Sequence, residues 1–221
     1  PDDQPVYLVG GAVRDALLQK PTHDLDFALP SGGIRIARRV ADALHGSFYP
    51  LDEERDTGRV ILVDPDGARH IMDFASFRGP DPSTGFRQDF DRLNLQTQPI
   101  SSGQSLEIDL RGRDFTINAL AVDVHSLASY DPLGGATDIR EKVIRACSPS
   151  VFRDDPVRVL RAVRQATSLG FSIEAETRKA MKRDVGLLFK ISAERIRDEL
   201  VKILEGPQPA AALRALDLIG A

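Results

Sequence analysis

Cysteine is almost absent from this sequence, since the 221 residues contain one, Cys147. A single cysteine excludes an internal disulfide and any zinc site built from several thiolates. The four histidines are far apart in the sequence, so there is no helical histidine pair to hold zinc. Any metal bound here is therefore expected on carboxylates, which favours Mg²⁺.

Long hydrophobic runs are missing too. No apolar segment approaches the roughly 20 residues of a membrane span, and the first residues lack the pattern of a signal peptide. With 42% hydrophobic and 28% charged residues, the composition is typical of a globular protein with one large or two small domains. We therefore expect a cytoplasmic chain with no membrane association.

Charge is unevenly divided along the chain. Residues 1–139 contain 13 basic and 22 acidic side chains, whereas residues 140–221 contain 16 basic and 11 acidic ones. Of the 29 basic residues 23 are arginine, which suits phosphates and base edges, although a GC-rich genome explains arginine usage equally well. The basic C-terminal part is where we expect a polyanionic partner.

Strand and helix patterns alternate in the first part of the chain. Hydrophobic periodicity predicts strands at 6–9, 25–29, 60–63, 70–74 and 119–124, and helices at 12–18 and 34–44. A turn signal at 64–67 indicates that 60–63 and 70–74 form a hairpin. Residues 78–105 lack periodicity and are expected to form a long loop.

From Asp154 onward the periodic segments are helical. They cover about 155–169, 174–184, 192–204 and 209–218. The fold class expected is therefore α+β, with a mixed α+β domain at residues 1–148 and an all-α domain at residues 149–221.

Two glycines follow the first predicted strand. A strand that runs into Gly10 and Gly11 and then into a helix lets backbone N–H groups approach a phosphate. Arg14, one turn into the helix, adds a charged fork. The alternative is a tight strand-to-helix turn without a ligand, and the glycine pair alone does not exclude it.

Asp24 and Asp26 alternate with apolar residues in the next predicted strand. Alternate side chains of a strand share a face, so both carboxylates project together while Leu25 and Phe27 enter the core. Such a pair can bind Mg²⁺ ions that activate an attacking hydroxyl and neutralise a leaving pyrophosphate. The alternative is a polar strand edge.

Asp73 is a third candidate acid, in a strand flanked by apolar residues. An unpaired buried carboxylate is costly, so this position needs either a catalytic function or a partner. A salt bridge with Arg59 or Arg78 is the structural alternative, and the sequence favours neither.

Three arginines follow Asp155 at intervals of three residues, namely Arg158, Arg161 and Arg164. This spacing places neighbours side by side on a helix, while the intervening apolar residues pack inward. A helix capped by aspartate, with its arginines in water, is the alternative. Cations near a helix N-terminus are unfavourable unless an anion is present, which favours a nucleotide site.

The order of five motifs resembles the family of class II tRNA nucleotidyltransferases and bacterial poly(A) polymerases. The matching segments are 7–27, 113–120, 131–145, 154–164 and 191–200. The resemblance implies a polymerase-β-like nucleotidyltransferase head with a mixed sheet and flanking helices, followed by a helical neck. It also implies that Arg113 contacts the nucleotide. Residues 57–60 read Thr-Gly-Arg-Val, which departs from the family's usual Gly-Thr-Val.

The resemblance further implies the activity and partners. The 3′-hydroxyl of a tRNA, or of another RNA, would attack the α-phosphate of CTP or ATP with Mg²⁺ as cofactor. Asp24 and Asp26 would bind the metal, and Gly10, Gly11 and Arg14 the triphosphate. The helical body and tail domains of the family are expected to be absent.

Three other functions share parts of this pattern. A poly(A) polymerase shares every motif. A non-catalytic RNA-binding relic of the fold would have no use for metal-binding acids, which argues against it. A nucleotidyltransferase acting on a small hydroxylated substrate is less favoured, because the basic residues 140–221 suit a polyanionic acceptor.

Overall fold

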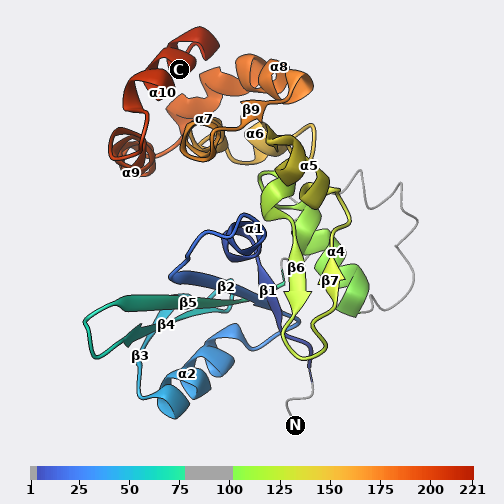
Figure 1. Cartoon of the computed structure of the whole chain (residues 1–221), viewed down its shortest axis with the longest axis vertical. Coiled ribbons are helices and arrows are strands. Elements are labelled where there is room, and N and C mark those ends of the chain that lie inside the picture. The colour runs from blue at the N-terminus through green and yellow to red at the C-terminus, as the bar shows by residue number, and fades with distance from the viewer. Residues whose placement is uncertain (1–3, 78–101) are drawn as a thin grey trace. The chain divides into compact units, whose positions relative to one another are not determined.

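The computed structural model describes residues 4–77 and 102–221, and the chain forms two compact units (Figure 1). The sheet unit comprises Pro1–Gly112 and Asn118–Pro132, and the helical unit comprises Arg113–Ile117 and Leu133–Ala221. The chain therefore passes from one unit to the other three times. The sequence predicts a boundary between head and neck after residue 148. The compact units divide at other residues, so this boundary stays a prediction.

A seven-stranded sheet is the framework of the sheet unit, in the order β3-β4-β5-β2-β1-β6-β7. Only β2 and β5 pair in parallel, and the other neighbours are antiparallel, so the sheet is mixed as expected. The strands are β1 (Tyr7–Val9), β2 (Asp24–Leu29), β3 (Ser47–Asp52), β4 (Thr57–Val63), β5 (Arg69–Ser76), β6 (Ala121–Asp123) and β7 (Ser129–Tyr130).

Helix α2 (Gly33–Leu44) covers one face of this sheet, beneath β4 and β5 in Figure 1. The core between them is apolar and consists of Leu29, Ala37, Ala41, Val60, Met72 and Phe74. Leu25 and Phe27 pack against this core. Because successive side chains of a strand alternate, Asp24 and Asp26 project from the opposite face.

Asp56 fixes the start of α2. Its carboxylate accepts hydrogen bonds from the backbone N–H groups of Gly32, Gly33 and Ile34 at 2.6, 2.9 and 3.0 Å. A Cβ at Gly33 would lie 2.1 Å from the Asp56 carbonyl oxygen, so only glycine allows this close approach. Burial alone would raise the pKa of Asp56, but hydrogen bonds from Ser76 and these amides outweigh it and lower the pKa.

The helical unit contains the all-α segment that the sequence predicts. Its helices are α5 (Gly135–Glu141), α6 (Val151–Asp154), α7 (Arg158–Leu169), α8 (Ala175–Asp184), α9 (Ala193–Leu204) and α10 (Pro209–Ile219), with a 3-10 helix at Val185–Lys190. Two short parallel strands, β8 (Val143–Ile144) and β9 (Ser172–Ile173), join its first part. Phe115 also pairs with Ala146 there, which ties the segment Arg113–Ile117 to this unit.

The expected long loop is wrong at its C-terminal end. Helix α4 (Ser102–Arg111) already begins at residue 102, and the remainder, 78–101, lies outside the described residues. Strands β3 and β7 were not expected either. Within the described residues, no helix is long and apolar enough to cross a bilayer.

Candidate active site

Asp24 and Asp26 are both exposed on β2, on the sheet face opposite α2. Helix α1 (Gly11–Leu17) contacts β1 and β2 and lies above the sheet in Figure 1. The expectation that the two carboxylates share a face and that Leu25 and Phe27 turn toward the core is confirmed.

Asp73 is held by Arg59. The Arg59 Nε donates to Asp73 Oδ1 at 2.8 Å and its Nη2 donates to Oδ2 at 2.7 Å. Asp73 also lies directly opposite Asp26 in the parallel pairing of β2 and β5. The structural alternative considered for Asp73 is thus present in the structure, and its catalytic function stays a prediction.

The donor set fits a hard divalent cation. Mg²⁺ keeps several waters and is bound through one or two carboxylates together with substrate phosphates, so two exposed aspartates suffice. Among the residues that the structure describes, no group of three or more His, Cys, Asp or Glu side chains is placed to hold a metal ion. Asp24 and Asp26 are thus the residues that would hold such a cation.

Gly10 and Gly11 turn the chain from β1 into α1. Gly10 has φ 74°, in the left-handed region that favours glycine. A Cβ at Gly11 would lie 3.4 Å from Arg14 Nη2, so the Arg14 side chain folds back over the turn. Arg14 is engaged within the protein, because Asp15 accepts from its Nε and Nη2, and Asn118 Oδ1 accepts from its Nη1 at 2.7 Å.

In the helical unit, Asp155 precedes α7 in an extended conformation, at the C-cap of α6. One carboxylate oxygen, Oδ2, accepts a 2.7 Å hydrogen bond from Arg195 Nη2 of α9. The other, Oδ1, is buried and has no hydrogen-bond partner among the described residues. A buried acceptor without a partner is unusual and is typical of a position that a ligand or water occupies.

The three arginines of α7 are half-buried and contact different partners. Arg158 Nη1 reaches the Val151 carbonyl at 3.5 Å, and Arg161 Nη2 lies 3.2 Å from Asp114 Oδ2. Arg164 Nε donates to Glu199 of α9 at 2.7 Å.

The arginines thus have protein partners, whereas the capped-helix alternative places them in water. Helix α7 also begins at Arg158 with Val157 as its N-cap, so neither Asp154 nor Asp155 caps it. The Nε of Arg161 is buried without a hydrogen-bond partner in the part of the chain that the structure describes.

Arg113 begins the segment that joins the helical unit, and Asp138 anchors this segment. Asp138 is buried and accepts from Thr116 Oγ1 at 2.6 Å and from Arg145 Nε at 3.0 Å. This hydrogen bond is the main reason that the pKa of Arg145 is raised. The second and third motifs therefore include residues that pack with each other inside the helical unit.

Two protein-family models match most of the chain. Residues 6–145 match the family described as "Poly A polymerase head domain", and residues 170–220 match "Probable RNA and SrmB- binding site of polymerase A". The chain belongs to the poly A polymerase head-domain family. The expected resemblance and fold class are both confirmed.

Curated proteins that are similar to this chain are named as tRNA nucleotidyltransferases or CCA-adding enzymes. The CC-adding tRNA nucleotidyltransferase of Geobacter sulfurreducens is 42% identical over 201 residues, which cover 91% of this chain and 40% of that protein. The CCA-adding enzyme of Geobacillus thermodenitrificans is 37% identical over 216 residues, covering 95% and 48%. The chain thus spans less than half the length of these relatives.

Solved structures that are similar to this chain include CCA-adding enzymes. The Thermotoga maritima CCA-adding enzyme complexed with tRNA matches with a TM-score of 0.78 and 31% identity, covering 99% of this chain and 47% of that one. A CCA-adding enzyme in complex with ATP matches with a TM-score of 0.80 and 30% identity, covering 98% and 48%.

Three residues that form hydrogen bonds with predicted site residues were not identified from the sequence. Arg195 donates a hydrogen bond to Asp155 Oδ2. Glu199 holds Arg164, and Asn118 holds Arg14. All three lie inside the recognised motifs, so a search for a partner of opposite charge or polarity among the motifs would have found them.

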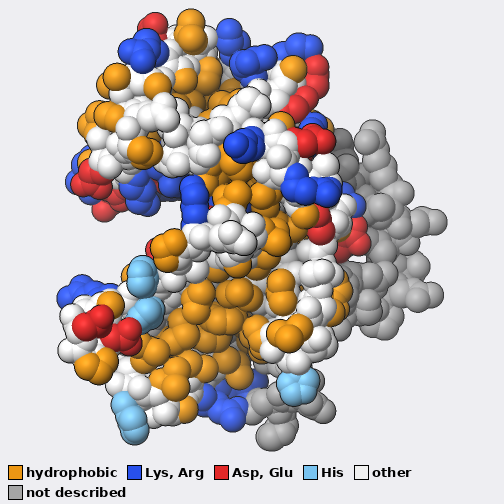
Figure 2. Space-filling view, in the orientation of Figure 1, with side chains coloured by type: hydrophobic (Ala, Val, Ile, Leu, Met, Phe, Trp, Pro, Cys, Tyr) orange, Lys and Arg blue, Asp and Glu red, His pale blue; other side chains and the backbone are white. Residues whose placement is uncertain are grey.

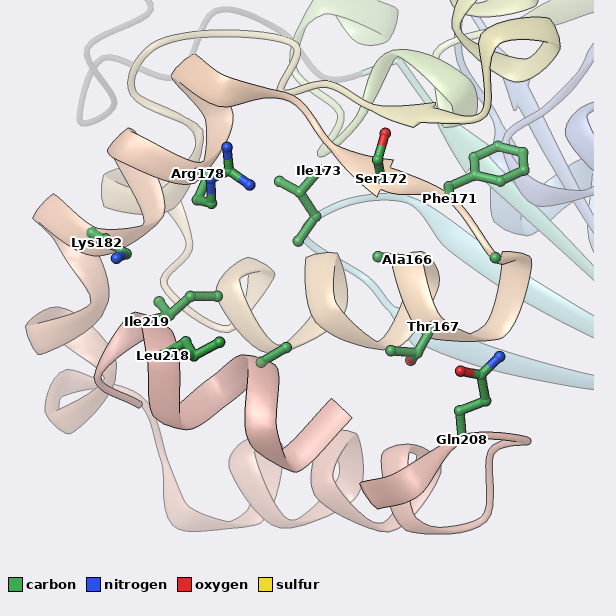
Figure 3. A pocket seen from close by; sticks show the side chains of 12 residues that line it. Ala166, Thr167, Phe171, Ser172, Ile173, Arg178, Lys182, Gln208, Leu218 and Ile219 are labelled. Carbon is green, nitrogen blue, oxygen red and sulfur yellow. The ribbon is translucent and has the colours of Figure 1, made fainter. Parts of the chain in front are cut away.

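A pocket of about 540 Å³ opens in the helical unit between α7, β9, α8 and α10 (Figure 3). Leu218 and Ile219 of α10 form its apolar side, and Arg178 and Lys182 come from α8. Asp155 and the three α7 arginines do not line it, so this pocket is separate from the predicted nucleotide-binding residues.

Basic side chains recur over the surface of the helical unit, where Figure 2 shows them in blue among acidic ones in red. Helix α8 alone exposes Arg178, Lys179, Lys182 and Arg183. Lys179 pairs with Glu176, and Arg183 with Asp184. This surface lies within the segment that matches the RNA-binding family.

Proposed function

We propose that this chain is the head and neck part of an enzyme that transfers CMP, AMP or both from CTP and ATP to the 3′ end of tRNA. Pyrophosphate is released, and no nucleic-acid template is used. The observation that carries the proposal is the pair of exposed carboxylates, Asp24 and Asp26, on one face of β2 in a chain 42% identical to a CC-adding tRNA nucleotidyltransferase. A tRNA acceptor would place the reaction in the cytoplasm.

The sheet unit supplies the metal and triphosphate sites in this proposal. Asp24 and Asp26 bind the divalent cation, which we take to be Mg²⁺, and Asp73 adds a third carboxylate to the same face. When bound, the metal lowers the pKa of the attacking hydroxyl and neutralises charge on the phosphates. The backbone at Gly10 and Gly11 approaches the triphosphate, and Arg14 supplies positive charge at the turn.

The helical unit selects the base. Cytosine and adenine both present an amino donor beside a ring-nitrogen acceptor. The unsatisfied Oδ1 of Asp155 is suited to accept from the amino group, and Arg158 to donate to the ring nitrogen. Uracil and guanine present the reverse pattern, so each contact would pair two donors or two acceptors, at a cost of about 1–3 kcal/mol per buried group.

The remaining basic residues have less direct functions. Arg161 and Arg164 keep their protein partners on the same helix as the base-reading Arg158, and Arg113 contacts the nucleotide sugar.

Transfer to defined tRNA ends tests the proposal. The full-length protein is incubated with Mg²⁺, CTP and ATP, and with tRNA transcripts that lack the last one, two or three nucleotides of CCA. We expect CMP addition to the two shorter acceptors, and sequencing of the products separates CC addition from CCA addition. If no tRNA end is extended under conditions in which the protein is folded, the proposed function is wrong.

A poly(A) polymerase is the second candidate, because the matching family is described by that name. It predicts long AMP tracts on RNAs that are not tRNA. The same assay with an unstructured RNA and ATP alone distinguishes the two activities.

A further inference from the structure

Arg59 lies in a row with two of the three carboxylates. The strands β4, β5 and β2 are neighbours, and their register places Arg59 opposite Asp73 and Asp73 opposite Asp26. Directly paired residues of neighbouring strands project to the same face. These three side chains therefore cross the sheet in one line, on the face that also carries Asp24.

This arginine engages both oxygens of Asp73, at 2.8 and 2.7 Å. A bidentate ion pair of this kind fixes the orientation of the carboxylate and also neutralises its charge. The side chains of Arg59 and Asp73 are 35% and 24% exposed, so solvent screens the pair only in part. A divalent ion on the same carboxylate would lie beside the guanidinium, which repels it.

The guanidinium also interacts with the other two acids. The hydrogen bond to Asp73 is the main reason that the pKa of Arg59 is raised, and the charges of Asp24 and Asp26 raise it further. The next residues on this face of β4 and β5, Ile61 and Ile71, are uncharged. Three carboxylates and one guanidinium leave two negative charges, which one divalent cation neutralises.

We propose that Arg59 is the positioning residue of this site: it keeps Asp73 out of the metal's coordination shell, so that Asp24 and Asp26 alone bind the cation. The proposal rests on the proposed function, because it requires a divalent cation at these two aspartates. It assigns Asp73 to a structural ion pair that sets the charge of the face.

Metal affinity in a double-mutant cycle tests this assignment. Mn²⁺ is titrated into the 221-residue chain, without nucleotide or RNA, and free Mn²⁺ is read by electron paramagnetic resonance. The proteins are the wild type, Arg59→Thr, Asp73→Asn and the double variant. Threonine suits a strand, and Arg59→Lys is the matched control that keeps the charge. Thermal unfolding of each protein confirms that it is folded.

The expected pattern follows from the charges. Arg59→Thr removes the positive charge and releases Asp73, so Mn²⁺ should bind about tenfold more tightly. Asp73→Asn leaves Arg59 unneutralised and should weaken binding about tenfold. The double variant should return to within about twofold of the wild type. Arg59→Lys keeps the charge but cannot engage both oxygens of Asp73, so its affinity should lie between those of the wild type and Arg59→Thr.

Two results overturn the proposal. If the double variant binds Mn²⁺ about tenfold more weakly than the wild type, Asp73 is a metal ligand. If all folded proteins bind equally, the Arg59–Asp73 pair has no effect on the metal. An Asp24→Asn, Asp26→Asn variant separates this failure from that of the proposed function: if it binds Mn²⁺ normally, the metal site itself is wrong.

Discussion

Two arginines, Arg59 and Arg195, each hold a carboxylate at one of the two proposed sites. Arg59 takes both oxygens of Asp73, whereas Arg195 takes only Oδ2 of Asp155 and leaves Oδ1 without a partner. The difference matters chemically. Both oxygens of Asp73 already accept hydrogen bonds, so this carboxylate contributes mainly its negative charge. Asp155 has a buried oxygen, Oδ1, with no hydrogen-bond partner among the described residues, so it can accept a hydrogen bond from a ligand.

Replacing Asp24 or Asp26 with asparagine should abolish nucleotide transfer with little change in folding. The substitution keeps the shape but removes a charge that the cation needs. Metal stabilisation contributes several kcal/mol, so we expect the rate to fall by about 10³-fold or more. Incorporation of CMP by the full-length protein measures the loss.

Asp42→Asn is the matched control for this prediction. Asp42 is exposed on α2, the helix that covers the opposite face of the sheet, and its loss changes the net charge equally. Near-normal transfer by either Asp24→Asn or Asp26→Asn in Mg²⁺ buffer would contradict the assignment.

Replacing Arg195 with glutamine should weaken nucleotide selection rather than stability. The pair with Asp155 is partly exposed, so its loss should change the free energy of unfolding by less than about 1 kcal/mol. A freed Asp155 would bind the amino group of cytosine less well, and the Kd for CTP should rise about three- to tenfold. The ratio of the Kd values for UTP and CTP should fall.

Calorimetric titration of the 221-residue chain measures both nucleotides. Arg197→Gln is the control, because Arg197 lies on the same helix and pairs with its neighbour Asp198. Unchanged CTP affinity in Arg195→Gln would mean that Asp155 does not read the base.

At the scale of elements, the parts that the sequence predicted have strong periodic patterns. Helix α2 and the β4–β5 hairpin were predicted because apolar residues recur at regular spacing and a Pro-Asp-Gly turn separates the two strands. Strand β3 was missed because it is mostly exposed and contains Pro50, so it shows no apolar alternation. Helix α4 was missed because its first residues are Ser, Gly, Gln and Ser.

The candidate site divides in the same way. Alternation along β2 was enough to place Asp24 and Asp26 on one face. The sequence left Arg59 open as one of two possible partners of Asp73, because both residues lie in the predicted hairpin region, 14 residues apart. It did not predict that Arg195 pairs with Asp155, because these residues are 40 positions apart on two different helical segments. Local periodicity carries no information about such pairs.

Replacing Asp56 with asparagine should destabilise the sheet unit through the start of α2. The carboxylate accepts from three backbone amides, and the loss of a helix cap costs about 1–2 kcal/mol. Because the folded state lowers the pKa of Asp56, its stabilisation is present above the ordinary carboxyl pKa and is lost as pH falls through the lowered value.

The difference in stability between the wild type and Asp56→Asn should therefore shrink from pH 7 to pH 3. Urea unfolding across this range measures it. Asp66→Asn, in the exposed β4–β5 turn, is the control and should show little difference at either pH. A difference that does not change with pH would show that the charge of Asp56 is not what caps the helix.

At the scale of the whole molecule, the part proposed to bind the metal is acidic and the part proposed to bind RNA is basic. The acidic first 139 residues contain the proposed metal site, and residues 140–221 carry 16 basic against 11 acidic side chains. Affinity for RNA accumulates over many phosphate contacts. A chain that spans less than half of its relatives is therefore expected to bind nucleotides but to hold tRNA weakly, with a Kd above about 1 μM at physiological salt.

The weak tRNA affinity should depend on α8. Arg178 and Lys182 are exposed there, and replacing both with serine should remove about two phosphate contacts. The slope of log K against log salt should then become shallower by about 1.8. Arg55→Ser with Arg69→Ser, two exposed positions in the sheet unit, removes the same charge and should leave the slope unchanged. Fluorescence anisotropy with labelled tRNA at several salt concentrations measures all three proteins. If the α8 variant and the sheet-unit variant lower the slope equally, tRNA responds only to the net charge and α8 is no specific contact surface.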